Sequence, residues 1–304
     1  MCGEVLDRLD LQPGDRVLDC TVGGAGHSAA ILERIGADGF LWGIERDPRT
    51  IERARERLAA VGNSFCLIQG NFADLEELAR QHQIQALDAV LLDLGTSIFQ
   101  LREAERGFSF LEEGPLDMRM NPEEGVPSAA DLVNGWSETD LRELFRTLGE
   151  ERFAGRIARV IVETRQREPF RRTTQLAETV IRAVPRTDKR RDRLHPATRV
   201  FQALRIAVND ELGAIEKVLP LAVGLLKSGG RIAVIAFHSL EDRIVKQSLR
   251  TMSASCVCPP RMPICTCAQV PLLARPAKAM FPSEAEVLEN APSRSARLRV
   301  ATRL

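Results

Sequence analysis

The chain has 304 residues, of which 44% are hydrophobic and 28% are charged, and its formal net charge is zero. This length and composition exclude a disordered protein and suffice for one large domain with a smaller one. No apolar run reaches the roughly 18 residues of a membrane helix, and the acidic N-terminus lacks the apolar core of a secretory signal. The odd, unevenly spaced set of 7 cysteines indicates a reducing, cytoplasmic location.

Charge is distributed unevenly along the chain. Residues 1–150 hold 14 basic and 28 acidic side chains, residues 151–205 hold 15 and 6, and residues 206–304 hold 13 and 8. A basic block inside a neutral chain suggests a polyanionic partner such as RNA. A solvated helical surface is the alternative interpretation of the same block.

The first 95 residues alternate between short apolar runs and amphipathic runs. This alternation predicts an α/β fold in which a parallel sheet carries helices on both faces. The predicted strands are residues 17–21, 40–45, 65–69 and 88–94, and the predicted helices are residues 27–35, 48–60 and 75–82.

The alternation stops near residue 100 and resumes after residue 195. In between, apolar residues recur at helical spacing, first around Leu141 and Phe145 and then around Ile157 and Ile161. We therefore expect an inserted, mostly helical domain over 101–195, with the α/β domain formed by 1–100 and 196–304. The last part is predicted to hold a helix over 196–226 broken near Pro220, a strand over 231–237, a helix over 239–248, an irregular loop over 254–277 and a strand over 296–304.

A glycine-rich turn from Gly23 to Gly26 joins the first strand to the first helix, and Glu45 ends the second strand. Such a βαβ unit binds a nucleotide cofactor, with the acid placed for two ribose hydroxyls. Ala25 stands where a dinucleotide enzyme has a glycine, and Asp19 precedes the turn as is typical of S-adenosylmethionine enzymes. The residues therefore favour S-adenosylmethionine over NAD.

Two side chains follow the next strands. Phe72 comes after the third strand, where it is either a core residue or an apolar border to the adenine. Asp93 ends the fourth strand, at the edge of the sheet where ligands bind in this fold. Because a buried strand does not itself need a terminal carboxylate, we expect Asp93 to be functional. The Asp-Pro-Pro-Tyr motif of amino-methyltransferases is absent from this position.

The long C-terminal helix opens at His195 and carries a polar stripe. Arg199, Gln202, Arg205 and Asn209 recur at helical spacing beside the basic block. The stripe is either a solvated face or a surface that binds phosphates and base edges. Both interpretations stay open.

His238 ends the fifth strand on the cofactor side of the sheet, where it is a candidate contact to substrate. Ser239 and Asp242 have the spacing of a capping box for the helix that follows. Cys256, Cys258, Cys265 and Cys267 form a C-x-C-x₆-C-x-C cluster. Four thiols can bind zinc, although the usual spacing is C-x₂₋₄-C, so a metal site stays open.

The motifs as a set resemble the bacterial small-subunit ribosomal RNA cytidine-N4 methyltransferases, the RsmH or MraW family, nearly end to end. The motifs that carry the resemblance are Gly-Gly-Ala-Gly-His-Ser (23–28), Leu-Leu-Asp-Leu-Gly (91–95), Arg-Gly-Phe-Ser-Phe (106–110), Gly-Pro-Leu-Asp-Met-Arg-Met (114–120), His-Pro-Ala-Thr-Arg-Val-Phe-Gln-Ala-Leu-Arg-Ile (195–206), Phe-His-Ser-Leu-Glu-Asp-Arg (237–243) and Ser-Arg-Ser-Ala-Arg-Leu-Arg (293–299).

The resemblance implies a Rossmann-like class I S-adenosylmethionine-dependent methyltransferase with an inserted helical domain. Its expected reaction is methyl transfer to the N4 amine of a decoding-centre cytidine in 16S rRNA, within the small ribosomal subunit. A homodimer stays open. Carried over by position, the cofactor contacts are Ala25, Gly26, His27, Glu45, Phe72, Asp93 and Gln100.

Asp93 is also the candidate catalytic acceptor for the protons of the amine. The candidate substrate-binding residues are His195, Arg199, Gln202, Asn209 and His238, and residues 151–205 with Arg294, Arg297 and Arg299 are expected to hold the RNA backbone.

One departure from the family pattern is Glu45, which stands where the family usually has Asp. Two other classes of function stay open, namely an RNA-binding assembly factor without transfer activity and a methyltransferase for a small molecule or a protein. Intact Asp19, Gly26, Glu45 and Asp93 argue against lost cofactor binding. The basic insertion argues against a small substrate.

Overall fold

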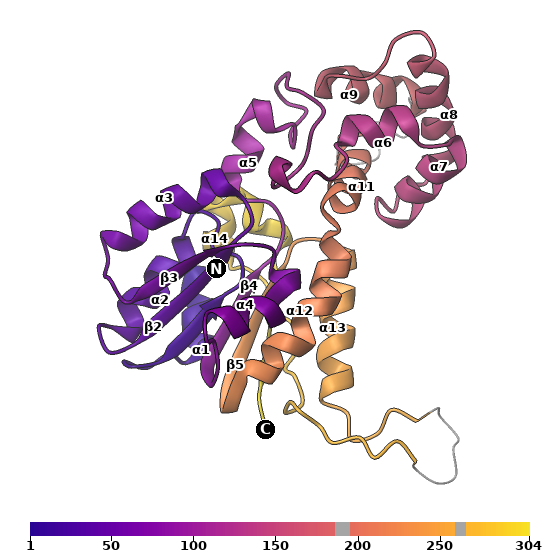
Figure 1. The fold of residues 1–304 in the computed structure, drawn as a ribbon. Coiled ribbons are helices and arrows are strands. Elements are labelled where there is room, and N and C mark those ends of the chain that lie inside the picture. Colours follow the sequence, from indigo (N-terminus) through magenta and orange to yellow (C-terminus); the bar gives the residue numbers. More distant parts are fainter. Residues whose placement is uncertain (186–194, 259–265) are drawn as a thin grey trace. The chain divides into compact units, whose positions relative to one another are not determined.

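The computed structural model describes residues 1–185, 195–258 and 266–304. The chain forms two compact units (Figure 1). The sheet unit consists of residues 1–95 and 212–304, and the helical unit consists of residues 96–211.

The sheet unit contains a 6-stranded sheet in the order β3-β2-β1-β4-β5-β6. The first five strands pair in parallel, and β6 is antiparallel to β5. This arrangement confirms the predicted α/β fold class. The strands are β1 (Arg16–Asp19), β2 (Phe40–Glu45), β3 (Phe65–Gln69), β4 (Leu87–Asp93), β5 (Leu226–Ala236) and β6 (Arg297–Thr302). The helices of this unit are α1 (Cys2–Leu9), α2 (Gly26–Ile35), α3 (Pro48–Ala59), η1 (Phe72–Asp74), α4 (Leu75–Gln81), α12 (Glu211–Leu225), α13 (Ser239–Met252), α14 (Glu284–Glu289) and η4 (Ala291–Ser295).

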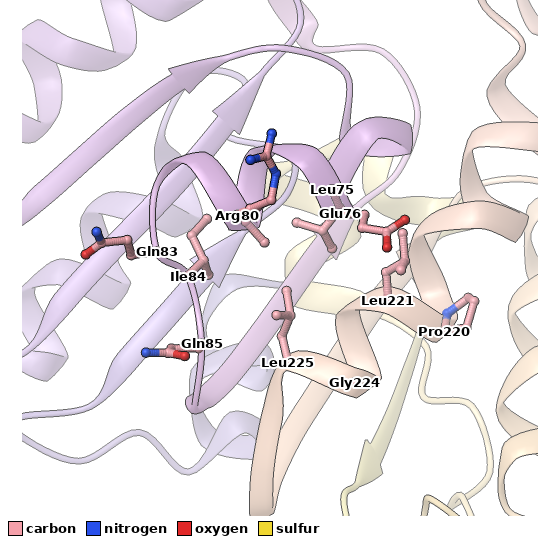
Figure 2. Close-up of a pocket in the computed structure, with 11 residues that line it drawn as sticks. Leu75, Glu76, Arg80, Gln83, Ile84, Gln85, Pro220, Leu221, Gly224 and Leu225 are labelled. Carbon is pink, nitrogen blue, oxygen red and sulfur yellow. The ribbon is translucent and has the colours of Figure 1, made fainter.

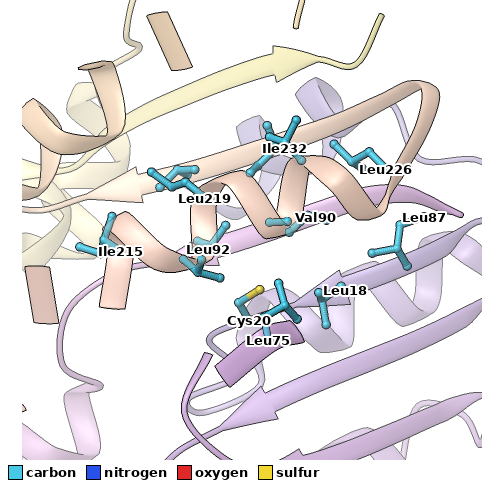
Figure 3. Packing of buried hydrophobic residues seen from close by; sticks show 14 of the residues in the cluster. Leu18, Cys20, Leu75, Leu87, Val90, Leu92, Ile215, Leu219, Leu226 and Ile232 are labelled. Carbon is cyan, nitrogen blue, oxygen red and sulfur yellow. The ribbon is translucent and has the colours of Figure 1, made fainter. Parts of the chain in front are cut away.

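Alternate residues of each strand are buried in different cores. Leu18 and Val90 belong to a cluster that includes Leu219 of α12, as Figure 3 shows. Their neighbours Val17 and Leu91 belong to a second cluster that includes residues of α1, α2 and α3. Because successive side chains of a strand point to opposite faces, these strands are covered on both sides. Their carboxyl ends therefore remain the place where polar side chains can gather.

The helical unit has its own apolar core. The two predicted stripes are buried in it, with Phe145 of α7 and Ile157 of α8 fully enclosed. Its elements are α5 (Ile98–Arg102), η2 (Ala104–Arg106), η3 (Pro122–Glu124), α6 (Ala129–Gly135), α7 (Glu138–Thr147), α8 (Ala154–Arg165), α9 (Thr173–Ala183) and α11 (Thr198–Asn209). No helix among the described residues is both long enough and apolar enough to cross a bilayer.

The predicted helix over 196–226 is divided at a different place from the one expected. Asp210 adopts a left-handed conformation with φ 49° and ends α11, whereas Pro220 lies inside α12. Asp is one of the few residues besides Gly that adopts this conformation readily. Val200, Leu204 and Val208 of α11 pack in the core of the helical unit. Along the chain, the helical unit therefore ends at residue 211 and not near the predicted residue 195.

Candidate active site

Asp19, at the end of β1, forms hydrogen bonds on both sides of the glycine-rich turn. Its Oδ1 accepts a hydrogen bond from Thr21 N at 2.9 Å, and its Oδ2 accepts one from Ser28 Oγ at 2.6 Å. The side chain has no exposed surface, and burial raises the pKa of its carboxyl. Asp19 therefore fixes the start of α2.

The turn has an unusual backbone. Gly23 and Ala25 have φ values of 50° and 56°, in the left-handed region that alanine rarely enters. The fully buried Ala25 precedes the first residue of α2, Gly26. On β2, a Cβ at Gly43 would lie 2.6 Å from a methyl of Val22, so β2 packs directly against the turn. Sequence reasoning missed Gly43, although a glycine inside a buried strand often marks a close approach.

Glu45, at the end of β2, is bonded to the same turn. Its Oε2 accepts from Gly23 N at 2.8 Å, and its Oε1 accepts from Asp47 N at 2.8 Å. Burial raises the pKa of Glu45 to about 7 and outweighs these two hydrogen bonds. Each carboxylate oxygen keeps a second lone pair, which leaves acceptor capacity for ribose hydroxyls.

His27 of α2 and Asp93 of β4 form a pair beside the turn. Asp93 N donates to Thr21 Oγ1 at 2.6 Å, and His27 Nδ1 lies 3.3 Å from Asp93 Oδ2. Burial lowers the pKa of His27, but the hydrogen bond and the charge of Asp93 outweigh it, so the pKa is raised overall.

The other two polar atoms of this pair are Asp93 Oδ1 and His27 Nε2. Both are buried and have no hydrogen-bond partner among the described residues. Buried polar atoms are almost always satisfied, and exceptions gather where a ligand binds. Asp93 Oδ1 and His27 Nε2 lie beside the left-handed turn and the N-terminus of α2. These two atoms therefore fit a polar ligand at the carboxyl ends of β1 and β4.

Phe72 and His238 follow the ends of β3 and β5. Phe72 begins η1 and packs partly against the apolar core, so its core interpretation holds for at least part of the ring. His238 is the N-cap of α13 and forms a capping box with Glu241. The predicted capping box of Ser239 and Asp242 is therefore wrong.

Asp242 instead pairs with two arginines of β6. Its Oδ1 lies 2.6 Å from Arg299 Nε, and its Oδ2 lies 2.8 Å from Arg297 Nη1. These hydrogen bonds outweigh burial and lower the pKa of Asp242. Both arginines thus join β6 to α13. The sequence predicted contacts with the RNA backbone for them and not this structural role.

Gln100 and His195 lie in the helical unit. Gln100 is buried and forms a capping box with Ser97 at the start of α5. His195 stacks on Phe110, with ring centroids 4.6 Å apart and planes inclined by 25°. Partial burial lowers the pKa of His195. Phe110 supports the exposed His195 ring from one side, and a base can stack on an aromatic ring of this kind.

The polar stripe of α11 is largely bonded within the helical unit. Arg199 lies 3.9 Å from a carboxylate oxygen of Glu151, and Gln202 donates to the carbonyl of Leu148 at 3.5 Å. Asn209 is buried and donates to the carbonyl oxygens of Met118 and Arg205. Its amide protons are therefore used to hold the segment that carries Met118.

The chain is similar to known proteins over its whole length. The profile of the MraW methylase family matches residues 1–304. The chain belongs to this family. It is 50% identical over 305 residues to the ribosomal RNA small subunit methyltransferase H of Trichlorobacter lovleyi, covering 99% of this chain and 96% of that protein. The protein of the same name from Geobacter sulfurreducens is 49% identical over 309 residues, covering 100% and 97%.

Family membership confirms the resemblance seen in the sequence, and with it the S-adenosylmethionine-dependent methyltransferase class. A separate pocket of about 610 Å³ lies between α4 and α12 and is lined by Leu75, Ile84 and Leu225 among others (Figure 2). Gln85 lies two residues before β4 and Leu225 directly precedes β5, so this pocket reaches the opposite, amino ends of these strands.

Proposed function

We propose that this chain transfers a methyl group from S-adenosylmethionine to the N4 amine of a decoding-centre cytidine in 16S rRNA. The observation that carries the proposal is the buried Oδ1 of Asp93, which has no partner among the described residues and is adjacent to a histidine-bonded Oδ2. The names of the relatives support the substrate class, and the family supports the reaction class.

The cofactor would be held by the residues around the glycine-rich turn. Glu45 would accept the ribose hydroxyls, and the left-handed turn through Ala25 to Gly26 would lie against the cofactor without side chains in the way. Phe72 would border the adenine, and Gln100 would complete the contacts from the helical unit. When bound, S-adenosylmethionine supplies a methyl group on a sulfonium centre, which needs no further activation.

Asp93 would act on the amine of cytosine. The lone pair of N4 is delocalised into the ring, so the nitrogen is a poor nucleophile until it becomes pyramidal. Oδ1 of Asp93 would accept a hydrogen bond from N4–H, favour that change, and take the proton that the amine loses once it carries the methyl group. His27 would hold the carboxylate in the orientation that presents Oδ1.

The RNA would be bound by the basic block of residues 151–205 in the helical unit. The exposed arginines among its described residues include Arg152, Arg156, Arg167, Arg171 and Arg182. Arginines at such density bind phosphates with salt-dependent affinity. The target base must leave its stack to reach Asp93. The proposed contacts to it are His195 on Phe110, Arg199, Gln202 and His238. The partner is 16S rRNA within the small ribosomal subunit, in the cytoplasm.

The test is transfer of labelled methyl groups from S-adenosylmethionine to small ribosomal subunits that lack the modification. Digestion of the RNA and nucleoside analysis should find the label in N4-methylcytidine. Label in another nucleoside, or in protein, would refute the proposed substrate. Binding of the cofactor without transfer to any RNA would indicate a binding factor instead.

A further inference from the structure

The segment between α13 and β6 carries cysteines that the proposed reaction does not use. Its base is fixed to the sheet unit, because Leu272 N donates to Met252 O and Ala274 N donates to Thr302 O, each at 2.8 Å. Between the end of α13 at Met252 and the start of α14 at Glu284, the described residues contain no helix or strand. Long irregular segments of this kind are uncommon in compact domains unless contacts of their own hold them.

Apolar packing does not supply those contacts between Met252 and Leu272, where the described side chains take no part in the apolar cores. Val257 is 49% exposed and Val270 is 73% exposed, so neither side chain is buried in a local core. What the segment does bring together is sulfur. The Sγ atoms of Cys256, Cys258 and Cys267 all lie within 4.8 Å of one another, although Cys267 comes from the returning part of the segment.

One pair of these sulfurs has the separation that two ligands of a tetrahedral metal ion have. Cys256 Sγ and Cys267 Sγ lie 3.8 Å apart. A tetrahedral zinc ion with Zn–S bonds of about 2.3 Å separates two of its sulfur ligands by about 3.8 Å. The separation of Cys256 Sγ and Cys267 Sγ therefore suits a tetrahedral ion, and Cys258 Sγ lies within 4.8 Å of both.

Backbone groups point at the same sulfurs. Val257 N lies 3.5 Å from Cys267 Sγ, and Cys258 N lies 3.4 Å from Cys256 Sγ, and both N–H groups donate. Hydrogen bonds from an outer shell orient metal ligands and stabilise the negative charge of thiolates. Soft thiolate ligands select zinc over the oxygen-seeking magnesium and calcium ions.

We propose that Cys256, Cys258 and Cys267 bind a structural Zn²⁺ ion that closes this segment upon itself. Cys265, which the sequence analysis grouped with them, lies outside the described residues. Three thiolates leave one position of the tetrahedron for a further ligand. The ion would stabilise the segment and would take no part in methyl transfer.

The first test measures metal in the full-length chain, purified with a reductant and dialysed against Zn²⁺. Mass spectrometry of the metal should find about one equivalent of zinc, since a structural site binds tightly at neutral pH. The triple variant Cys256→Ser, Cys258→Ser, Cys267→Ser should lose it. The matched control Cys66→Ser, which changes a thiol of β3, should keep it.

The second test replaces zinc with Co²⁺, whose absorption spectrum reports its ligands. The wild-type chain should show thiolate-to-cobalt charge-transfer bands and tetrahedral d–d bands, and this result is decisive even if a variant fails to fold. A chelator should also speed proteolysis between Ser253 and Val270. Wild-type protein without zinc or thiolate bands would overturn the proposal. So would a reduced chain that binds no metal but forms a Cys256–Cys267 disulfide in air, because the cluster would then be a redox pair.

Discussion

His27 Nδ1 lies 3.3 Å from Asp93 Oδ2, whereas His27 Nε2 and Asp93 Oδ1 are buried and have no protein partner among the described residues. One side of each group is therefore fixed by the other, and the opposite side of each is left for a ligand. This relationship joins the N-terminal turn of α2 to the end of β4. It explains why an acid at the end of a buried strand can be both held by the fold and available for chemistry.

His27→Phe should slow methyl transfer by about 100-fold, because a misplaced catalytic group can cost that factor. The phenyl ring is slightly larger than the imidazole and has no N–H group to fix Oδ2 of Asp93. His27→Asn, whose amide nitrogen can replace Nδ1, should recover part of the rate. The measurement is the rate of single-turnover transfer at saturating cofactor, with melting temperatures to check folding. Equal rates for His27→Phe and the wild type would show that the pair does not position Asp93.

Cofactor affinity should depend on pH through Glu45. Its pKa is raised to about 7, so the carboxyl is protonated below that pH and ionised above it. Ribose hydroxyls donate to the ionised form, and so affinity should rise as pH increases through about 7 and then level off. Calorimetric titration on both sides of this pH measures the effect.

The matched control for this prediction is Glu45→Gln, which cannot ionise but leaves His27 unchanged. Its affinity should be lower than that of the wild type at high pH and should lack the rise that Glu45 causes. If both proteins show the same pH profile, another group is responsible.

Gly43→Ala should destabilise the sheet unit by about 1–3 kcal/mol, the usual cost of overpacking. The new Cβ would lie 2.6 Å from Val22 and 2.8 Å from Leu67. Gly3→Ala is the matched control, because nothing lies within 4 Å of a Cβ there and α1 should gain helix propensity. Urea unfolding measures both. Equal stability of the two variants would contradict the close packing of β2 against the turn.

Arginines of the helical unit should govern RNA affinity. Arg156→Gln and Arg167→Gln remove exposed charges from the basic block, and each should weaken RNA binding and lower the salt slope by about 1. Arg80→Gln, on α4 of the sheet unit, is the charge-matched control. Binding is measured by fluorescence anisotropy over a range of salt concentrations. A similar loss for all three variants would mean that the protein binds RNA through net charge alone.

The alternating pattern of the first 95 residues was enough to predict the sheet, because buried parallel strands and amphipathic helices have distinct periods. The end of α11 at Asp210 could not be predicted in this way, since the left-handed conformation of an aspartate does not change the hydrophobic pattern. α1 was missed as well, although its apolar positions Val5 and Leu9 have helical spacing. The break predicted near Pro220 does not occur, because α12 accommodates this proline in its interior.

The candidate site divides in the same way. Glu45 and Asp93 could be placed from sequence, because the acids follow strands whose carboxyl ends share one edge of the sheet. The pairing of His27 with Asp93 depends on β1 lying beside β4, a long-range contact that spacing cannot reveal. The pairing of Arg299 with Asp242 has the same origin, whereas the capping role of His238 is local and was missed because histidine is not a usual N-cap residue.

The most direct measurement compares the wild type with Asp93→Asn in single-turnover methyl transfer to small ribosomal subunits, with nucleoside analysis of the product and calorimetry of cofactor binding. The wild type should place the label on the N4 amine of a cytidine. Asp93→Asn, which keeps the size of the side chain but cannot take a proton, should bind the cofactor and lose transfer by about 10²–10⁴-fold. Full transfer by Asp93→Asn would contradict the role of Asp93, and wild-type label on any other nucleoside would contradict the proposed function.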